Sequence, residues 1–364
     1  MQITVINPLQ ETIIFGVIFF IVLFFSLRRK KGTDVFPVET TNEIKGFAMI
    51  AIVLSHIGYF LSRQTDFLFP FSIYAGVSVD LFLFLSGYGL AVSAFKKQLS
   101  VKEFYKKRVA KLFVPLWTIL ILLLLLDYFF LQKTYPLQDV ILSFFGIFRH
   151  ADLFQDINSP LWYITLTLFY YILFPFFFSQ KRPLFSAIGL YLAGWLLLQT
   201  ALPVSAGVFW LYTLHIFAFP LGILGATIMQ KLGNKSESFL QTKLLRWVAL
   251  ALSVTAFVYF GLHSEVGKGY VLEQLGSLLL LLFCLLIFLF KKVQFQLLSI
   301  FGIYSYEIYL IHWPLLYRYD FLYKYMPAGL ATALYLLILL GLAFLLSRLL
   351  NKLPYISQKA QKQT

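Results

Sequence analysis

The chain has 364 residues, of which 60% are hydrophobic and only 13% are charged, and its mean hydropathy is +0.81. This composition excludes a soluble globular protein of the same length. The formal net charge of +14 does not indicate nucleic-acid binding, because Lys and Arg stand in short clusters between apolar runs. The single cysteine, Cys284, excludes an intrachain disulfide and a cysteine metal cluster, and we expect no bound metal.

Eleven apolar runs are long enough to cross the ~30 Å hydrocarbon core of a bilayer. The first run is followed by the basic stretch 28–31, whereas a cleavable signal peptide carries its positive charge before the apolar stretch, so we expect a retained helix. The sequence therefore predicts an all-α, polytopic membrane bundle of about eleven transmembrane helices. The predicted spans are 8–27, 44–62, 73–94, 112–130, 161–178, 184–202, 207–229, 245–262, 270–290, 297–317 and 328–348.

Basic residues are distributed unequally between the two sides of this bundle. If the N-terminus lies outside, the cytoplasmic segments carry 24 of the 30 Lys and Arg residues. The six on the outer side are Arg63, Lys133, Arg149, Lys268, Arg318 and Lys324. Under the positive-inside rule, this asymmetry predicts an outer N-terminus and a cytoplasmic C-terminus.

The chain divides into an extra N-terminal helix with a basic loop (1–41), a main transmembrane domain (42–350) and a short cytoplasmic tail (351–364). Tryptophans near span ends are typical of an interfacial aromatic belt. They are Trp117, Trp162, Trp210 and Trp313. The longest outer loop, 131–160, is polar enough to contact a water-soluble substrate, although most such loops are solvated connections. Its polar residues include Asp139, His150, Asp152, Asp156 and Asn158.

Two ionisable residues of the second span share a helix face. Lys45 and His56 are eleven residues apart, which at ~100° per residue returns to the same face, ~16 Å along the axis. Ionisable groups inside a bilayer are costly and are functional candidates by default. The alternative is that Lys45 only sets the topology and His56 is a hydrogen-bonded core histidine.

Other ionisable residues are expected at a similar depth. Asp80, in GVSVDLFLFLSGYGL, is expected in the outer half of the membrane, where its carboxylate would orient His56. The alternatives are a structural ion pair and a polar group that faces an outer cavity. Ser86, Gly87 and Gly89 permit close helix packing. His215 has no polar neighbour on its span and is expected to be a core histidine.

The tenth predicted span, SIFGIYSYEIYLIHWPLLY, carries three further candidates. Ser305 and His312 are seven residues apart and share a face, whereas Glu307 points elsewhere. Pro314 is typical of a helix that lines a cavity.

A basic cluster lies where the chain re-enters the membrane from the cytoplasm. Arg108 and Lys111 stand at i, i+3 spacing beside Lys106 and Lys107. Such a cluster is suited to binding phosphates. Attraction to anionic lipid or a topological role is the alternative.

At these residues the sequence resembles the membrane acyltransferase-3 family, whose members transfer acetyl or other short acyl groups to carbohydrates and related molecules. The resemblance extends from about Asn42 to Leu316. It is carried by KGFAMIAIVLSH, VDLFLFLSGYGL, FYKKRVAKLFVP, LWYITLTLFYY and SYEIYLIHWPLL, in this order.

The resemblance implies site residues. Lys45 and His56 would be the essential pair, Asp80 a site residue, and Arg108 and Lys111 part of the basic motif. Lys45 and Lys111 stand where arginine is common in the family, which would replace bidentate phosphate binding by a point charge. Residues expected to contact the acceptor or the oxyanion are His312, Ser305, Glu307 and Trp162.

The resemblance also implies a reaction and a location. We expect an O-acyltransferase of the bacterial plasma membrane, with acetyl as the expected acyl group. Its donor would be cytoplasmic acetyl-CoA or another acyl-CoA, and its acceptor a hydroxyl of an extracytoplasmic glycan or cell-envelope polymer, with no tightly bound cofactor. His56, held by Asp80, would act as general base in a direct transfer, a covalent acyl intermediate being the alternative.

Two other classes of protein remain open at this stage. A transporter or flippase for envelope glycans or their lipid-linked precursors also carries ionisable residues within its spans. A sensor or scaffold would explain the topology but not the shared face of Lys45 and His56. Acceptor identity, acyl chain length and oligomeric state carry no readable signal.

Overall fold

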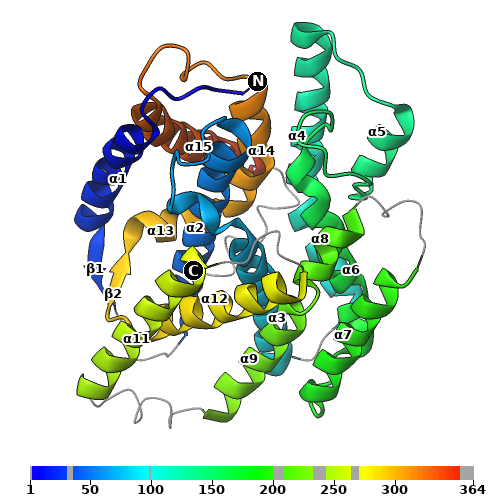
Figure 1. Cartoon of the computed structure of the whole chain (residues 1–364). Coiled ribbons are helices and arrows are strands. Elements are labelled where there is room, and N and C mark those ends of the chain that lie inside the picture. Colours follow the sequence, from blue (N-terminus) through cyan, green and yellow to red (C-terminus); the bar gives the residue numbers. More distant parts are fainter. Residues whose placement is uncertain are drawn as a thin grey trace.

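The computed structural model describes residues 2–30, 36–97, 100–200, 208–232, 243–263 and 270–352, and this part of the chain is almost entirely helical (Figure 1). Within it, nine helical segments are long and apolar enough to cross a membrane. They are α1 (Pro8–Phe25), α2 (Val38–Ser55) with the π-helix η1 (His56–Leu61), α3 (Ala75–Lys96), α4 (Val101–Leu131), η3 (Ser159–Leu161) with α6 (Trp162–Phe177), α8 (Phe209–His215) with α9 (Ala218–Leu232), α11 (Lys243–Leu262), α12 (Tyr270–Phe290) and α15 (Ala328–Asn351).

The other two predicted spans are helical too. α7 (Pro183–Leu198) has 16 residues, and the tenth span is divided at Tyr304 into α13 (Gln296–Ile303) and α14 (Ser305–Tyr317). The prediction of an all-α, multi-pass membrane protein is therefore confirmed. Parts of the sequence predictions lie outside the described residues, namely positions 201–202 and 207 of two spans, Lys31, Lys235, Lys268 and the tail from 353 onward.

Two short elements lie outside the spans, and one span is longer than predicted. η2 (Phe71–Ile73) and α5 (Leu137–Phe144) stand in connecting segments. α4 begins eleven residues before its predicted start, because Ser100 accepts a hydrogen bond from the Glu103 amide at the helix N-terminus. The basic cluster is consequently part of α4, which sets the relative positions of Arg108 and Lys111.

Segments that are predicted to share a side of the membrane do meet in the structure. β1 (Leu27–Arg29) pairs with β2 (Val293–Phe295) as a small antiparallel sheet, which joins the end of α1 to the start of α13 (Figure 1). At the opposite end of α1, the Gly329 amide donates to Glu11 Oε2, 2.8 Å away. The structure thus agrees with the order of the crossings, whereas the absolute orientation still rests on the charge pattern.

Glycines allow the central helices to approach closely. A Cβ on Gly46 of α2 would stand 1.8 Å from the Leu298 carbonyl oxygen of α13, and one on Gly87 of α3 would stand 2.2 Å from the Phe219 carbonyl oxygen of α9. The predicted packing role of Gly87 is therefore confirmed. Gly89 was assigned the same role wrongly, because its Cβ position is empty space and the residue lines a cavity.

Candidate functional site

A cavity of about 830 Å³ lies between α2, α3, α4, α6, α8, α12 and α14. Lys45 and His56 both line it, as their shared helix face predicts, because α2 is regular as far as Ser55. The other predicted site residues on its wall are Arg108, Lys111, Trp162, Ser305 and Glu307. Asp80 and His312 are fully buried behind the wall. Seven of the nine predicted site residues therefore face the cavity, whereas Asp80 and His312 do not.

Three cations gather at one end of the cavity. Lys45 of α2 lies close enough to Lys111 and Arg108 of α4 for the three positive charges to repel one another. The Arg108 guanidinium lies over the rings of Phe104 and Tyr171, 5.7 and 5.3 Å from their centroids, which holds it in place without a carboxylate. Within the described part of the chain, neither Lys45 nor Arg108 has a carboxylate within ion-pair distance. Their charge is thus available to an anionic ligand.

Glu307 belongs to this basic end. It lines the cavity and interacts electrostatically with Lys111. The expected contact of Glu307 with the acceptor or the oxyanion stays a prediction. The Ser305 hydroxyl donates to the Gly302 carbonyl, 3.0 Å away, where α13 ends and α14 begins.

His56 stands farther along the cavity and contacts a second histidine. Its Nδ1 lies 2.8 Å from Nε2 of His312, and the two rings are nearly parallel, with centroids 4.9 Å apart and planes at 9°. His312 Nδ1 is in turn 2.8 Å from the carbonyl oxygen of Tyr309. The ring of Trp313 covers an edge of His56 at 5.3 Å.

These contacts determine the tautomers of two neutral imidazoles. A carbonyl oxygen only accepts, so Nδ1 of His312 carries a proton and donates it to Tyr309, leaving the lone pair on Nε2. His56 must then donate its Nδ1 proton to that lone pair. The lone pair of His56 is left on Nε2, at the ring edge away from His312. This is the arrangement that a general base requires.

The local sequence explains how both histidines are held. At His56 the α-helix α2 changes to the π-helix η1, a form that is frequent at functional sites. Pro314 lacks an amide proton, so it cannot bond the Leu310 carbonyl four residues earlier in α14. Asn158 Nδ2 donates to that carbonyl instead, 2.8 Å away. The proline thus provides the point at which the outer loop docks beside His312.

Asp80 does not hold His56, contrary to the sequence-based hypothesis. Its Oδ1 lies 2.7 Å from Nδ1 of His215, and its Oδ2 accepts a hydrogen bond from Ser277. Asp80 is thus held in a structural contact with His215, one of the alternatives that the sequence left open, rather than beside His56. His215 lines the cavity, so a second imidazole held by a buried partner faces the same space as His56.

The roles assigned to His312 and Trp162 also change. Both ring nitrogens of His312 are hydrogen-bonded and its side chain is fully buried, so it orients His56 and does not reach an oxyanion. Trp162 stacks on His215 with ring centroids 5.8 Å apart. Of the four tryptophans predicted to form the interfacial belt, Trp117 and Trp210 are exposed, but Trp313 is buried beside the site.

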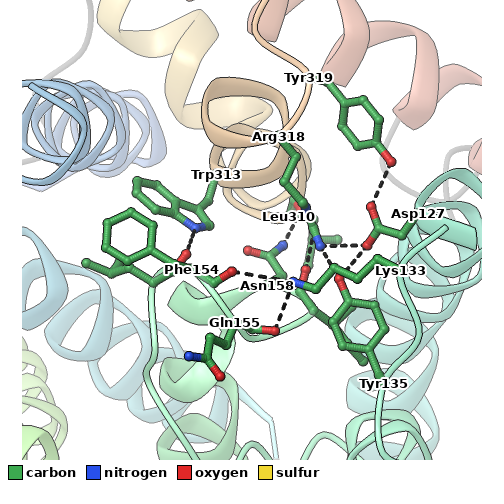
Figure 2. A network of polar contacts seen from close by, with 12 residues as sticks. Asp127, Lys133, Tyr135, Phe154, Gln155, Asn158, Leu310, Trp313, Arg318 and Tyr319 are labelled. Carbon is green, nitrogen blue, oxygen red and sulfur yellow. Dashed lines mark hydrogen bonds and ion pairs between the residues drawn. The ribbon is translucent and has the colours of Figure 1, made fainter. Parts of the chain in front are cut away.

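A polar network on the predicted outer side holds the loop that follows α5 (Figure 2). Arg318 donates to Asp127 Oδ2 at 2.6 Å, and Tyr319 donates to Asp127 Oδ1 at 2.7 Å. The Trp313 indole donates to the Leu153 carbonyl, and Lys133 donates to the Gln155 carbonyl. These bonds tie the ends of α4 and α14 to residues 153–158, beside the His56 and His312 pair.

Sequence reasoning missed several of these residues. Ser277 and Tyr309 carry no signal that separates them from ordinary span residues. His215 was dismissed because it lacks a polar neighbour on its own span, although its partner comes from α3. The buried Asp127 is an acidic residue at the end of an apolar run, and that was the signal available for it.

Comparison with known proteins gives one match. The family model described as an acyltransferase domain, that of the acyltransferase-3 family, matches residues 42–352. No curated protein and no solved structure matches the chain. The matched region begins at the start of α2 and includes every residue of the cavity wall named above.

Proposed function

Because this chain belongs to the acyltransferase-3 family and is a multi-pass membrane acyltransferase, which transfers groups other than amino-acyl groups, we propose a specific reaction for it. It transfers an acyl group from cytoplasmic acyl-CoA to a hydroxyl of an extracytoplasmic glycan, and acetyl is the acyl group that we expect. The observation that carries the proposal is the single cavity that holds a cationic end and a histidine whose Nε2 lone pair is free.

The cationic end supports an acyl-CoA donor. Lys45, Arg108 and Lys111 present three positive charges to the cavity, and the phosphates of coenzyme A are the groups that need them. Lys45 and His56 are ~16 Å apart along the helix axis, a span that suits the extended pantetheine arm. The thioester would then lie beside His56, in an apolar part of the cavity that limits hydrolysis.

The transfer then proceeds as a direct attack. His56 Nε2 takes the proton of the acceptor hydroxyl while that oxygen bonds to the thioester carbonyl carbon. The tetrahedral intermediate collapses, the carbon–sulfur bond breaks, and the proton passes from His56 to the departing thiolate. The products are an acyl ester and free coenzyme A. His312 keeps the proton of His56 on Nδ1 throughout the first step.

The test is acyl transfer by the purified full chain in liposomes, with radiolabelled acetyl-CoA and the envelope polymer fraction of the source cells. We expect alkali-labile label on the polymer, and a loss of about 10²- to 10⁴-fold with His56→Ala. His263→Ala is the matched control, because that histidine is exposed at the end of α11. Unreduced ester formation by His56→Ala would exclude His56 as the base.

The same vesicles separate the proposal from transport. A flippase moves labelled glycan across the bilayer without forming an ester, whereas the proposed enzyme forms the ester and needs the donor on the side of Lys45. For the assumed bacterial plasma membrane, that side is the cytoplasm. Ester formed only when the donor is on the opposite side would overturn the proposed route.

A further inference from the structure

A second cavity, of about 370 Å³, lies within the loop between α4 and η3, on the predicted outer side. It shares no lining residue with the His56 cavity. Its volume is at the small end of the range for ligand pockets, about 300–1,000 Å³. Tyr135 and Phe148 supply aromatic rings, and the polar lining residues are Asp139, Ser143, Arg149, His150, Asp152, Gln155, Asp156 and Asn158.

Two polar atoms on this wall are buried without a partner among the described residues. Asn158 is 2% exposed, and while its Nδ2 donates to Leu310, its Oδ1 bonds nothing. Nε of Arg149 is also buried and unpaired. Buried polar groups are nearly always hydrogen-bonded, so an acceptor and a donor left unpaired beside one cavity favour a polar ligand, which reaches them once the side chains of the wall adjust.

The charge of the wall limits the class of ligand. Three carboxylates face one guanidinium, and the Arg149 Nη1 lies 3.4 Å from Asp139, so that cation is already neutralised. Burial raises the pKa of Asp156 to about 6, which leaves its carboxyl able to donate as well as accept near neutral pH. Such a wall repels phosphate and suits hydroxyl groups, while the aromatic rings suit the apolar face of a sugar.

The loop is also a partition between the two cavities. Ala151, Leu153, Ser159 and Pro160 line the His56 cavity, whereas Asp152, Gln155, Asp156 and Asn158 line the outer one. The network of Figure 2 fixes this segment through Arg318, Lys133 and Trp313. A ligand in the outer cavity is therefore held in a defined position relative to His56 but separated from it by the loop.

We propose that the outer cavity binds one neutral sugar ring of the acceptor, a unit adjacent to the one that is acylated. This inference rests on the proposed function and adds to it a second subsite for the glycan acceptor. The bound ring contributes affinity and register, and its own hydroxyls do not react because the loop lies between them and His56.

The first test measures binding on the full chain in detergent, with saturation-transfer NMR and calorimetry. The probes are methyl glycosides of glucose, galactose and N-acetylglucosamine, with glucose 1-phosphate as the anionic counterpart. We expect at least one neutral glycoside to bind and the phosphate to bind at least 10-fold more weakly. Absence of binding by every neutral glycoside, or tighter binding of the phosphate, overturns the proposal.

Variants then locate the bound glycoside. Gln155→Trp fills the cavity from a side chain that makes no hydrogen bond in the described structure, and Asp156→Asn keeps the shape but removes the carboxyl. Each is expected to weaken binding at least 10-fold. Asp66→Asn, on an exposed outer residue, is the matched control and should bind like the wild type. Equal binding by Gln155→Trp and wild type overturns the assignment.

The kinetic test separates this subsite from the proposed reaction. Gln155→Trp is expected to raise the acceptor KM at least 10-fold while kcat and the acyl-CoA KM stay within about 2-fold. An unchanged acceptor KM contradicts the subsite. His56→Ala should bind the glycoside normally yet lose acyl transfer. Full transfer by His56→Ala would refute the proposed base but not the subsite. Loss of glycoside binding in Gln155→Trp would support the subsite whatever the base is.

Discussion

Replacing His312 tests the arrangement of the two histidines most directly. His312→Leu keeps a buried side chain of similar size but removes the acceptor for the Nδ1 proton of His56, now 2.8 Å away. The free energy cost of leaving that donor unpaired is about 1–3 kcal/mol. This cost falls on the tautomer of His56 whose Nε2 is free to act as the base, so it adds to the activation free energy. At about 1.4 kcal/mol per factor of ten, kcat should fall about 5- to 150-fold.

His312→Gln provides the conservative comparison. A glutamine Oε1 also accepts a hydrogen bond, so it can hold the same tautomer of His56, and kcat should stay within about 5-fold of wild type. Both variants are assayed for ester formation at saturating donor and acceptor, with the melting temperature in detergent measured in parallel. A purely structural role for His312 would lower the melting temperature and kcat together, and glutamine would then not restore kcat selectively.

Two results would refute the reasoning. If His312→Leu retained the wild-type kcat, the tautomer of His56 would not depend on His312. If leucine and glutamine reduced kcat equally at equal melting temperature, the hydrogen bond between the rings would not be what matters. His56→Ala serves as the lower limit, because no imidazole remains to take the proton.

Three further predictions address other parts of the site. Lys45→Met should raise the acyl-CoA KM at least 10-fold, and Lys45→Arg should keep the wild-type KM. The control is Lys181→Met, which removes a positive charge from an exposed residue predicted to face the same side of the membrane. The effects of Asp80→Asn and His215→Asn on the free energy of unfolding should be non-additive, with a coupling of about 0.5–3 kcal/mol. The effects of Asp80→Asn and His312→Gln should add within about 0.5 kcal/mol. Additive effects of the first pair would contradict the observed contact. Burial raises the pKa of Asp156 from 3.8 to about 6 against the opposing effect of His150, so its contribution to loop stability is complete below pH 3.8 and lost as the pH rises through 6. The protection factors of residues 152–157, which are exchange rates corrected for the intrinsic rate at each pH, should therefore be higher at pH 5 than at pH 7.5, and a difference in protection that persists in Asp156→Asn would assign it to another group.

The family assignment and the helical arrangement were predictable from the sequence because they depend on local patterns. Apolar runs of sufficient length form helices in a bilayer, since a helix satisfies its backbone hydrogen bonds within one continuous segment. The helical repeat of α2 likewise placed Lys45 and His56 on one face, and both do line the same cavity. The same reasoning located Arg108 and Lys111 on the helix that closes the basic end.

The partners of the buried polar groups followed from tertiary structure alone. His56 and His312 are 256 residues apart, and Asp80 and His215 are 135 apart, so no spacing rule connects them. Asp80 and His56 were expected at one depth, but depth does not determine which helix face a side chain presents or which neighbour it meets. Asp80 contacts His215 and Ser277 where α3 packs against α8 and α12, and His312 contacts His56 where α14 packs against α2 and η1. The membrane location, the transmembrane spans and the shared face of Lys45 and His56 depend on residues near one another in the chain, so the sequence determined them. The pairing of charged groups and imidazoles depends on how distant helices pack, so only the tertiary structure decided it.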